Sequence, residues 1–340
     1  MRHVGRRTDP QDIATQEQIW QSAAKNKIIN GDMNISQRGS SFSGVSSSTY
    51  SLDRWFCGAS TSAVVTISQQ QDAPVGSDFQ RCLQVLVTTN SSVISVGHVV
   101  NIHQRIEGFN IADLVGKTFT FSFWVKSSVS GIHCVSFANG GVDRSFVAEY
   151  TVNSANTWER KVVTVLGGLP TSGTWNYAEG YGLRVAFALA TSSQFHASAG
   201  SWQIGNFIST ANQVNCLATV GNVFAITGVQ LETGSLPTTF EHRHIGLELS
   251  LCQRYFNRLN IADGFYRYVG ASGSFALATV PFPSMRSAPS ATLISGGASG
   301  VASSPAFSAS NGFLRINATA SGVGEAALNG NPVIDLSAEL

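Results

Sequence analysis

The chain has 340 residues, of which 43% are hydrophobic and only 12% are charged, and its formal net charge is +1. This length is sufficient for two or three domains, because single hydrophobic cores rarely grow beyond about 250–300 residues. A near-neutral chain lacks the clustered basic surface that nucleic-acid binding needs, so DNA and RNA are not expected partners. Ordinary soluble proteins are roughly one quarter charged, and a surface this poor in charge is common among extracellular β proteins.

The cysteines and the apolar runs argue against a disulfide-rich, zinc-binding or membrane-spanning protein. The five cysteines are odd in number and form no CxxC pair, which predicts buried free thiols rather than disulfides or a zinc site. No apolar run approaches the roughly 18 residues of a membrane span, and the N-terminus lacks the apolar core of a signal peptide. We therefore expect no membrane insertion. An exterior-type composition without a secretion signal suggests a virion component that is released by lysis.

Residues 1–26 are predicted to be an attachment segment with a short helix. The segment DPQDIATQEQIWQSAAKN carries Thr15 and Gln18 at capping-box spacing, and Ile19 and Ala23 give a narrow apolar stripe. A helix of about three turns is marginal alone in water, so it needs a surface on which to pack.

Residues 27–241 predict an antiparallel jelly-roll β-sandwich. In TFTFSFWVKSS, Phe119, Phe121 and Phe123 point to one face and Trp124 points to the other. Similar alternations recur in WERKVVTV, GLRVAFALA and NVFAITGVQLE, with Gly/Ser/Pro turns between them. Because a period of two buries one face of each strand, two sheets must close on each other. The fold class is therefore all-β.

Residues 242–260 predict a helix that links two β domains. Apolar residues step by four, three, four and three positions along it, at Ile245, Leu249, Cys252, Phe256 and Leu259. Two heptads do not distinguish packing on the sandwich from a short self-associating seam. Both alternatives stay open, and the second makes these five residues a candidate oligomer interface.

Residues 261–340 predict a small C-terminal β domain. Short alternations such as FLRINATA occur in a tail that is rich in Gly, Ala and Ser and poor in bulky apolar residues. Such a piece has little apolar area to offset the entropy lost on ordering. We therefore expect it to depend on neighbouring copies of the chain for the burial that it lacks alone.

Two aromatic loops are candidate ligand sites. Tyr and Trp pair an apolar ring with a polar handle, which suits carbohydrate or protein surfaces. The candidate ligand residues in TSGTWNYAEGYG and ATSSQFHASAGSWQ are Trp175, Asn176, Tyr177, Glu179, Tyr181, Phe195 and His196. The alternative is that some of these rings close the sandwich core, which is favoured for Trp158 and Trp202 in their alternating strands.

No catalytic, cofactor or metal site is predicted. The chain contains no GxSxG, HExxH, P-loop or GxGxxG motif, and its carboxylates are scattered singly. His242 and His244 would share a face of an extended strand, but a structural metal site usually needs four ligands, so a polar hinge is favoured. Glycosidase carboxylate pairs need no local motif, and an enzyme therefore remains an alternative.

Three carboxylates have expected structural roles. Glu232 would be a charge at the end of a strand, and Glu241 an anchor for Arg243 or Arg254. In SLDRW, Asp53 and Arg54 are expected to form an ion pair beneath Trp55.

Several motifs together resemble tail-fibre and tail-associated proteins of bacteriophages and prophages. They are KNKIINGDMNISQRG, YSLDRWFCG, FTFSFWVKSS, NTWERKVVTV and FAITGVQLETGSLPTTFEHRHIGLELSLCQRYF, and they cover roughly residues 27–256. DIATQEQIW is similar to a segment near the tail-attachment end of many fibre proteins, and VPFPSMRSAP to a C-terminal strand of the family. The sandwich also resembles jelly-roll carbohydrate-binding modules.

The resemblance implies a structural protein of the phage tail, most often a homotrimer, that displays β domains to the host surface. The expected function is multivalent adhesion to a host glycan or surface protein, without enzymatic activity. The N-terminal segment would bind other tail proteins. One alternative is a tail or head adaptor or decoration protein that binds no receptor, and another is a carbohydrate-active depolymerase.

Overall fold

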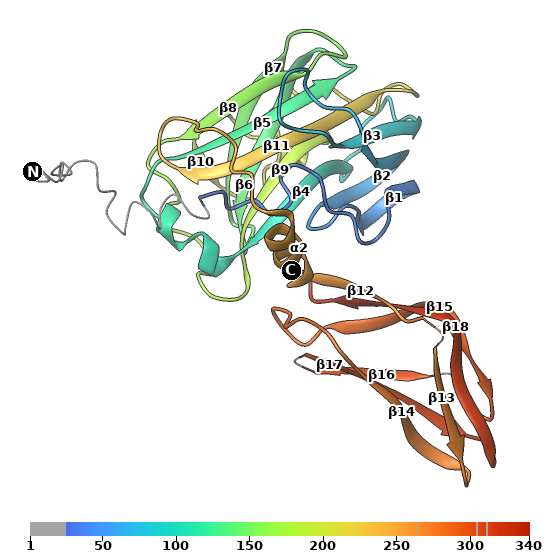
Figure 1. Ribbon diagram of the computed structural model, residues 1–340. Coiled ribbons are helices and arrows are strands. Elements are labelled where there is room, and N and C mark those ends of the chain that lie inside the picture. The colour runs from blue at the N-terminus through green and yellow to red at the C-terminus, as the bar shows by residue number, and fades with distance from the viewer. Residues whose placement is uncertain (1–24, 263, 304, 311) are drawn as a thin grey trace, which may run out of the picture.

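The computed structural model describes residues 25–262, 264–303, 305–310 and 312–340, which form two β domains joined by one helix (Figure 1). The predicted N-terminal helix and most of the attachment segment lie outside the described residues. The predominantly antiparallel β architecture expected from the alternating segments is confirmed, since all named strand pairs are antiparallel.

The first domain contains eleven strands and three short 3-10 helices. The strands are β1 Ser41–Tyr50, β2 Phe56–Gln70, β3 Cys82–Thr89, β4 Val99–Glu107, β5 Phe119–Ser127, β6 Gly131–Asn139, β7 Arg144–Val152, β8 Glu159–Val165, β9 Tyr181–Thr191, β10 Trp202–Ile204 and β11 Val223–Thr233. The 3-10 helices are Gly108–Asn110, Ala112–Leu114 and Ser193–Phe195.

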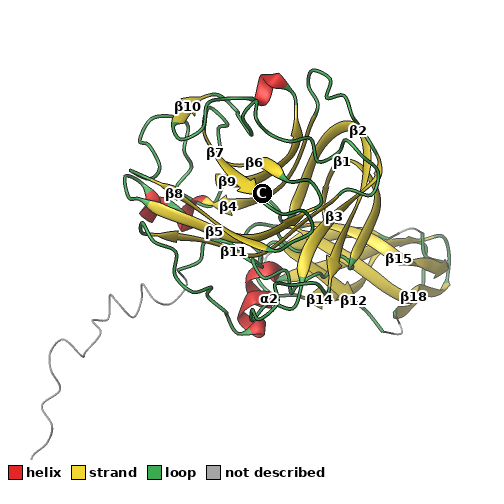
Figure 2. Cartoon of the chain, turned by 90° about the horizontal axis from the view of Figure 1, so that it is seen from above, coloured by secondary structure: helices red, strands yellow, loops and turns green. Residues whose placement is uncertain are grey.

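These strands form two layers that share strand β2. The hydrogen-bonded order is β10-β7-β6-β9-β4-β2-β3-β11-β5-β8, with β1 added on β2. The first residues of β2, 56–60, pair with β4, and residues 64–70 pair with β3. The strand therefore passes from one layer to the other, and Figure 2 shows the β3-β11-β5-β8 layer alongside the layer that contains β6, β9 and β4.

The core between the layers is built from phenylalanines, as the alternation predicts. The Phe121 ring lies 5.5 Å from Phe137 on β6 and 5.7 Å from Phe187 on β9, measured between ring centroids. Phe123 lies 4.9 Å from Phe187, and Phe119 lies 5.3 Å from Phe137. All five rings are fully buried. At about 25 cal/mol per Å² of apolar area, these contacts are a main source of the stability of the sandwich.

The linking helix is shorter than predicted. Helix α2 spans Ile245–Gln253, and the following residues 256–260 form strand β12 instead of a further helical turn. The backbone of β12 finds its partners in β18, the last strand of the C-terminal domain, where Phe256 pairs with Ser337. Long-range pairing thus overrides the local helical spacing that Phe256 and Leu259 show.

The C-terminal domain contains two small sheets. Its strands are β12 Phe256–Asn260, β13 Phe265–Val269, β14 Gly273–Pro281, β15 Ser290–Gly300, β16 Ala306–Ser310, β17 Phe313–Ala320 and β18 Gly324–Ser337. One sheet has β12, β13 and β15 paired with β18, and the other has the order β14-β17-β16. Its apolar core includes Leu314, Ile316, Leu328, Ile334 and Leu336, so the single chain already encloses a small core here.

A buried ionic cluster joins the two domains. Glu339, whose side chain is 5% exposed, pairs with Arg54 and with Arg38 at 3.0 Å, both from the first domain. In the other direction, Glu107 on β4 pairs with Arg286 of the C-terminal domain at 3.7 Å. Glu107 also accepts hydrogen bonds from Arg254 at 3.0 Å and Tyr255 at 3.1 Å, which lie between α2 and β12. Charged side chains from one domain are thus neutralised by the other, which fixes the joint.

Candidate functional site

An aromatic groove lies on the outer face of the β3-β11-β5-β8 layer. It has a volume of about 400 Å³ and is open to solvent. Its lining residues come from the loop before β3, from β5, β8 and β11, and from the segment after β11; they are Ser77, Asp78, Phe79, Ser122, Trp124, Arg160, Gly228, Pro237, Thr238, Thr239, Phe240 and His242. The sheet supplies the floor, and two loops supply the walls.

Gly228 shapes the floor of the groove. The register of β11 against β5 shifts between Thr227 and Gln230, which marks a bulge, and Gly228 lies in it with a positive φ of 59°. A Cβ atom at this position would lie 2.5 Å from the Phe79 ring and 3.1 Å from Trp124. Because only glycine has no Cβ, both rings can rest directly on the backbone of the strand.

Three rings form one wall of the groove. Phe79 and Phe240 meet edge to face with centroids 5.0 Å apart, and His242 lies 5.5 Å from Phe79 and 4.9 Å from Phe240. Trp124 projects from the polar face of β5, opposite the buried phenylalanines, and is half-buried. The groove therefore offers flat apolar faces beside hydroxyl, carboxylate and guanidinium groups.

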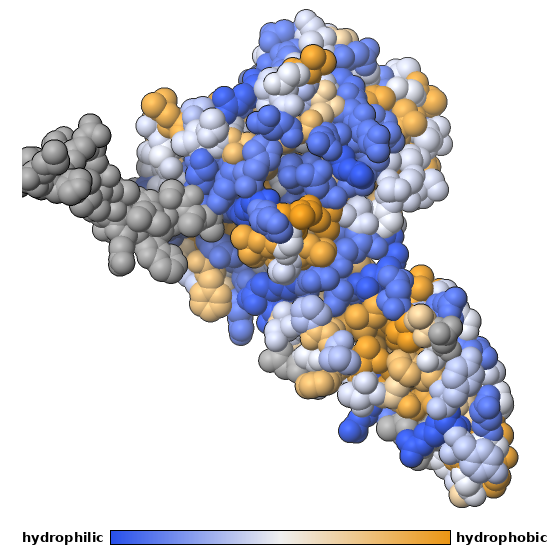
Figure 3. Space-filling model, viewed as in Figure 1, coloured by the Kyte–Doolittle hydropathy of each residue, from blue (hydrophilic) through white to orange (hydrophobic). Residues whose placement is uncertain are grey.

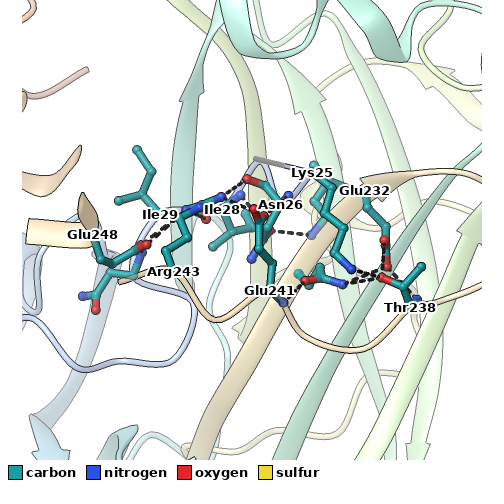
Figure 4. Close-up of polar contacts among 12 residues, drawn as sticks. Lys25, Asn26, Ile28, Ile29, Glu232, Thr238, Glu241, Arg243 and Glu248 are labelled. Carbon is teal, nitrogen blue, oxygen red and sulfur yellow. Dashed lines mark hydrogen bonds and ion pairs between the residues drawn. The ribbon is translucent and has the colours of Figure 1, made fainter. Parts of the chain in front are cut away.

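The turn after β11 forms the rim, and buried side chains of β11 hold it in place (Figure 4). Glu232 is 3% exposed and accepts hydrogen bonds from the backbone N–H of Thr238 at 2.9 Å and from its hydroxyl at 2.7 Å. Gln230 accepts a hydrogen bond from the N–H of Glu241 at 2.8 Å. The role of Glu232 as a charge near the turn is confirmed, and the rim is a fixed structure.

Arg243 ties the same segment to the start of the described chain. Its guanidinium pairs with Glu248 of α2 at 3.2 Å and with Glu241 at 3.4 Å, and it donates to the carbonyl of Ile28 at 3.2 Å (Figure 4). Glu241 in turn accepts a hydrogen bond from the N–H of Asn26 at 2.7 Å. The expected anchoring of Arg243 by Glu241 is confirmed. The segment from 232 to 248 is therefore held against residues 26–28 at the start of the described chain.

The predicted aromatic loop keeps two of its rings together. Trp175 is half-buried, stacks on Tyr177 with centroids 6.3 Å apart, and meets Trp202 edge to face at 5.7 Å. The side chain of Tyr177 is 38% exposed. Asn176 accepts a hydrogen bond from the N–H of Ala178 at 2.7 Å, so its carboxamide oxygen stabilises the local turn.

The other predicted residues of this loop face elsewhere. The Tyr181 ring lies 5.3 Å from the guanidinium of Arg105 and is half-buried on β9. Glu179 is exposed, and its backbone carbonyl accepts a hydrogen bond from Arg286 of the C-terminal domain at 2.7 Å. These two residues belong to the joint between the domains rather than to a common ligand surface.

Phe195 and His196 lie in a different part of the sandwich. Phe195 packs against a buried cluster of Cys134, Val147 and Ile208 on the outer face of the other layer. His196 lines a shallow hollow of about 420 Å³ together with Glu149, Thr210, Asn212 and small side chains. None of the residues lining this hollow belongs to the 175–181 loop, so the predicted ligand residues do not converge on one site.

The predicted oligomer residues divide between surface and core. Ile245 is 54% exposed at the start of α2. Cys252 is fully buried and packs with Ile29 and Tyr255, and Leu249 packs against the same cluster. The helix therefore uses part of its stripe to pack on its own chain. Phe256 is buried in β12, which removes it from any helical seam.

Two expectations about charged residues are corrected. Asp53 does not pair with Arg54; it accepts hydrogen bonds from Gln37, while Arg54 pairs with Glu339. Arg54 has a positive φ of 69°, which turns its side chain away from its sequence neighbour. The partner Glu339 lies 285 positions later in the chain, so the sequence spacing could not reveal it.

The histidines and cysteines have separate roles. His242 belongs to the aromatic wall, whereas Nδ1 of His244 accepts a hydrogen bond from the N–H of Gly246 at the start of α2. Within the described ranges, no three His, Cys, Asp or Glu side chains gather as metal ligands would. The five cysteines are free and buried, as predicted. No helix in the described part of the chain is long and apolar enough to cross a membrane.

One sequence signal for the groove was missed by the prediction based on aromatic loops. Trp124 stands on the polar face of an alternating strand, and an outward-facing Trp needs a neighbour or a ligand to cover it. Its partners Phe79 and Phe240 lie 45 and 116 positions away, so only the folded chain brings them together.

Comparisons with known proteins give distant structural similarities. No known protein family matches the sequence, and no curated protein matches it. The enzymatically active domain of tailspike protein 4 from bacteriophage CBA120 aligns with 62% of this chain at 18% identity and a TM-score of 0.33, and the match spans only 22% of that protein. The family 11 carbohydrate-binding module of the Clostridium thermocellum cellulase Lic26A-Cel5E aligns with 56% of this chain and 91% of its own, at 14% identity and a TM-score of 0.31.

A third solved structure is similar to the same degree. The module TmCBM61 in complex with β-1,4-galactotriose aligns with 62% of this chain and all of its own, at 9% identity and a TM-score of 0.31. Identities and TM-scores this low do not transfer a function to this chain. The function has to be argued from its own residues.

Proposed function

We propose that this chain is a non-enzymatic structural protein of a phage tail, of the tail-fibre or receptor-binding type, that attaches the particle to glycans on the host surface. The observation that carries the proposal is the aromatic groove. Sugar rings present apolar C–H faces that stack on aromatic side chains, and their hydroxyls need polar partners nearby. Phe79, Trp124 and Phe240 supply the rings, and Ser122 and Asp78 supply polar groups at the same groove.

The lining of the groove favours binding over hydrolysis. Glycosidases use two carboxyl groups about 5–10 Å apart on either side of the scissile bond. Among the described residues, Asp78 is the one carboxylate that lines the groove. Glu232 lies behind the rim, where the hydrogen bonds to Thr238 occupy it. A depolymerase would need a second carboxylate, which neighbouring copies of the chain would have to provide.

Adhesion through this groove would depend on several copies. A single shallow groove binds a glycan weakly, whereas several grooves on one particle raise the avidity by about 10²–10⁴ on a repetitive surface. The proposed location is the tail of a virion that is assembled in the host cytoplasm and released by lysis. The motifs in residues 27–256 that resemble phage tail proteins support this location.

The proposal is tested with the purified chain on a glycan array and on intact host cells, beside the variant Trp124→Ala. We expect the wild-type chain to bind a restricted set of glycans and Trp124→Ala to lose about fivefold or more in affinity, because stacking of a ligand ring on one aromatic side chain contributes about 1–3 kcal/mol where it has been measured for nucleobases. Tyr177→Ala is the matched control, because it removes an exposed ring outside the groove. Equal binding by Trp124→Ala would exclude the groove as the site. A chain that binds neither glycans nor cells would support the adaptor alternative.

A further inference from the structure

Two cations meet at the rim of the aromatic groove. The Arg160 guanidinium donates a hydrogen bond to the carbonyl of Thr238 at 3.2 Å. The Lys25 ammonium donates to the Thr238 hydroxyl at 2.5 Å and to the carbonyl of Thr239 at 2.9 Å (Figure 4). Both cations thus touch the same turn, whose residues line the groove.

Arg160 lies beside Trp124, whose indole is the largest aromatic ring of the groove. In the pairing of β5 with β8, Arg160 lies directly opposite Trp124. Side chains at directly opposed positions of an antiparallel pair share one face, with Cβ atoms about 4.5–5.5 Å apart. A sugar ring stacked on Trp124 therefore places its ring substituents within reach of the guanidinium.

Arg160 has no carboxylate partner among the described residues. All ion pairs found within those residues involve other side chains, and the one contact of the Arg160 guanidinium, to Thr238, is with a neutral carbonyl. Asp78, the one carboxylate that lines the groove in the described part of the chain, belongs to the loop before β3. The sheet order β3-β11-β5-β8 puts that loop on the far side of β11 from β8. The β8 side of the groove therefore carries two cations, Arg160 and Lys25, against one buried carboxylate, Glu232, and its net charge is positive.

Resting on the proposed function, we infer that the groove selects anionic sugars. A pyranose ring stacks on Trp124, and its acidic substituent is bound by the guanidinium of Arg160. A guanidinium offers a planar pair of donors that matches a carboxylate, and such charge-assisted hydrogen bonds are about twice as strong as neutral ones. Asp78, on the opposite side, accepts hydrogen bonds from sugar hydroxyls. The ligand class is an acidic polysaccharide, such as one that contains uronic acids.

The inference is tested with a matched pair of probes that differ only in charge. Isothermal titration calorimetry compares an oligogalacturonate with its methyl ester, and sialylated and sulfated oligosaccharides with their neutral parents. We expect the wild-type chain to bind at least one acidic probe about tenfold more tightly than its neutral counterpart, as the strength of charged hydrogen bonds implies. Arg160→Gln should bind both members of that pair with the lower affinity. Trp124→Ala should lose both.

A matched control separates local recognition from net charge. Arg267→Gln removes the same charge from β13 in the C-terminal domain, and it should leave the preference for the acidic probe unchanged. Equal affinity of the wild-type chain for acidic and neutral probes would overturn the inference while leaving glycan binding intact. The same loss in Arg267→Gln as in Arg160→Gln would also overturn it. Absence of binding to every probe would count against the proposed function itself.

Discussion

Arg54 is the residue on which the joint between the domains depends most. Its side chain is 2% exposed and pairs with Glu339, which is itself 5% exposed. The guanidinium also donates to the carbonyl of Arg105 at 2.5 Å and lies 3.5 Å from the centre of the Tyr255 ring. We expect Glu339→Gln to lower the free energy of unfolding by about 3–5 kcal/mol, because it leaves a buried cation without its partner. Urea denaturation measures the change.

A double variant distinguishes the lost charge from lost packing. Arg54→Met with Glu339→Leu removes both charges and keeps most of the apolar volume, and it should be clearly more stable than Glu339→Gln alone. If the double variant is the less stable of the two, packing around Glu339 and not its charge holds the joint.

Asp143 gives a pH-dependent contact at the predicted aromatic loop. Hydrogen bonds from the Asn139 side chain, and from the N–H and hydroxyl of Thr174, lower the pKa of this carboxyl to about 2. A lowered pKa stabilises the folded loop above the unfolded value near 3.9, and this contribution is lost as the pH falls through about 2. We therefore expect the NMR signal of the Trp175 indole N–H, which donates to Ser172, to shift with a midpoint near pH 2.

The variant Asp143→Asn is the control for that titration. It keeps an acceptor for the Thr174 N–H but cannot ionise, so the Trp175 signal should show no transition in this range. A wild-type midpoint near the ordinary aspartate value would contradict the assigned hydrogen bonds.

At the scale of elements, the bulge in β11 is the feature that shapes the groove. Gly228→Ala should lower the free energy of unfolding by more than about 1 kcal/mol, because alanine is strained at a positive φ and its Cβ would collide with Phe79. It should also weaken glycan binding, since the Phe79 ring has to move. Gly76→Ala is the matched control: Gly76 also has a positive φ, of 76°, but no atom lies near its missing Cβ. Equal effects of the two substitutions on binding would show that the floor does not depend on Gly228.

The elements that the sequence predicts well are those decided by local alternation. The phenylalanines of β5 point inward and Trp124 outward because a strand alternates its side chains, and burial of one face fixes the register. The end of α2 was not predictable in this way. Phe256 and Leu259 fit a helical spacing, but β12 gains backbone partners from β18 and an ion pair between Arg258 and Asp335 at 2.6 Å.

The candidate site was predicted less well than the fold, for the same physical reason. Sequence reasoning favours aromatic residues that cluster along the chain, as in the loop with Trp175 and Tyr177. The groove instead collects Phe79, Trp124 and Phe240 from three separate segments. A lone glycine in an alternating strand, such as Gly228, signals a bulge or a close approach, but it does not say which side chains will lie on it.

At the scale of the whole molecule, the C-terminal domain leaves much apolar surface uncovered. Figure 3 shows apolar side chains gathered on its visible face. Tyr268 on β13 is 73% exposed, Phe313 on β17 is 54% exposed and Ile294 on β15 is 51% exposed. Large exposed apolar patches are uncommon on monomers and mark interaction surfaces. These exposed side chains, which lie on strands of both sheets, support the proposal that the domain assembles with further copies of the chain.

The assembly is tested by the solution mass of the intact chain. A homotrimer predicts a light-scattering mass of three times 36.0 kDa. Ile294→Lys should shift that mass towards the monomer, because a charge in a buried apolar interface is left unpaired. Val75→Lys is the control, since Val75 is fully exposed on a loop of the sandwich. A monomeric wild-type chain would contradict the proposed avidity, because each chain carries one groove and that groove would then bind the host surface alone. Adhesion would in that case require that the virion itself hold several chains side by side.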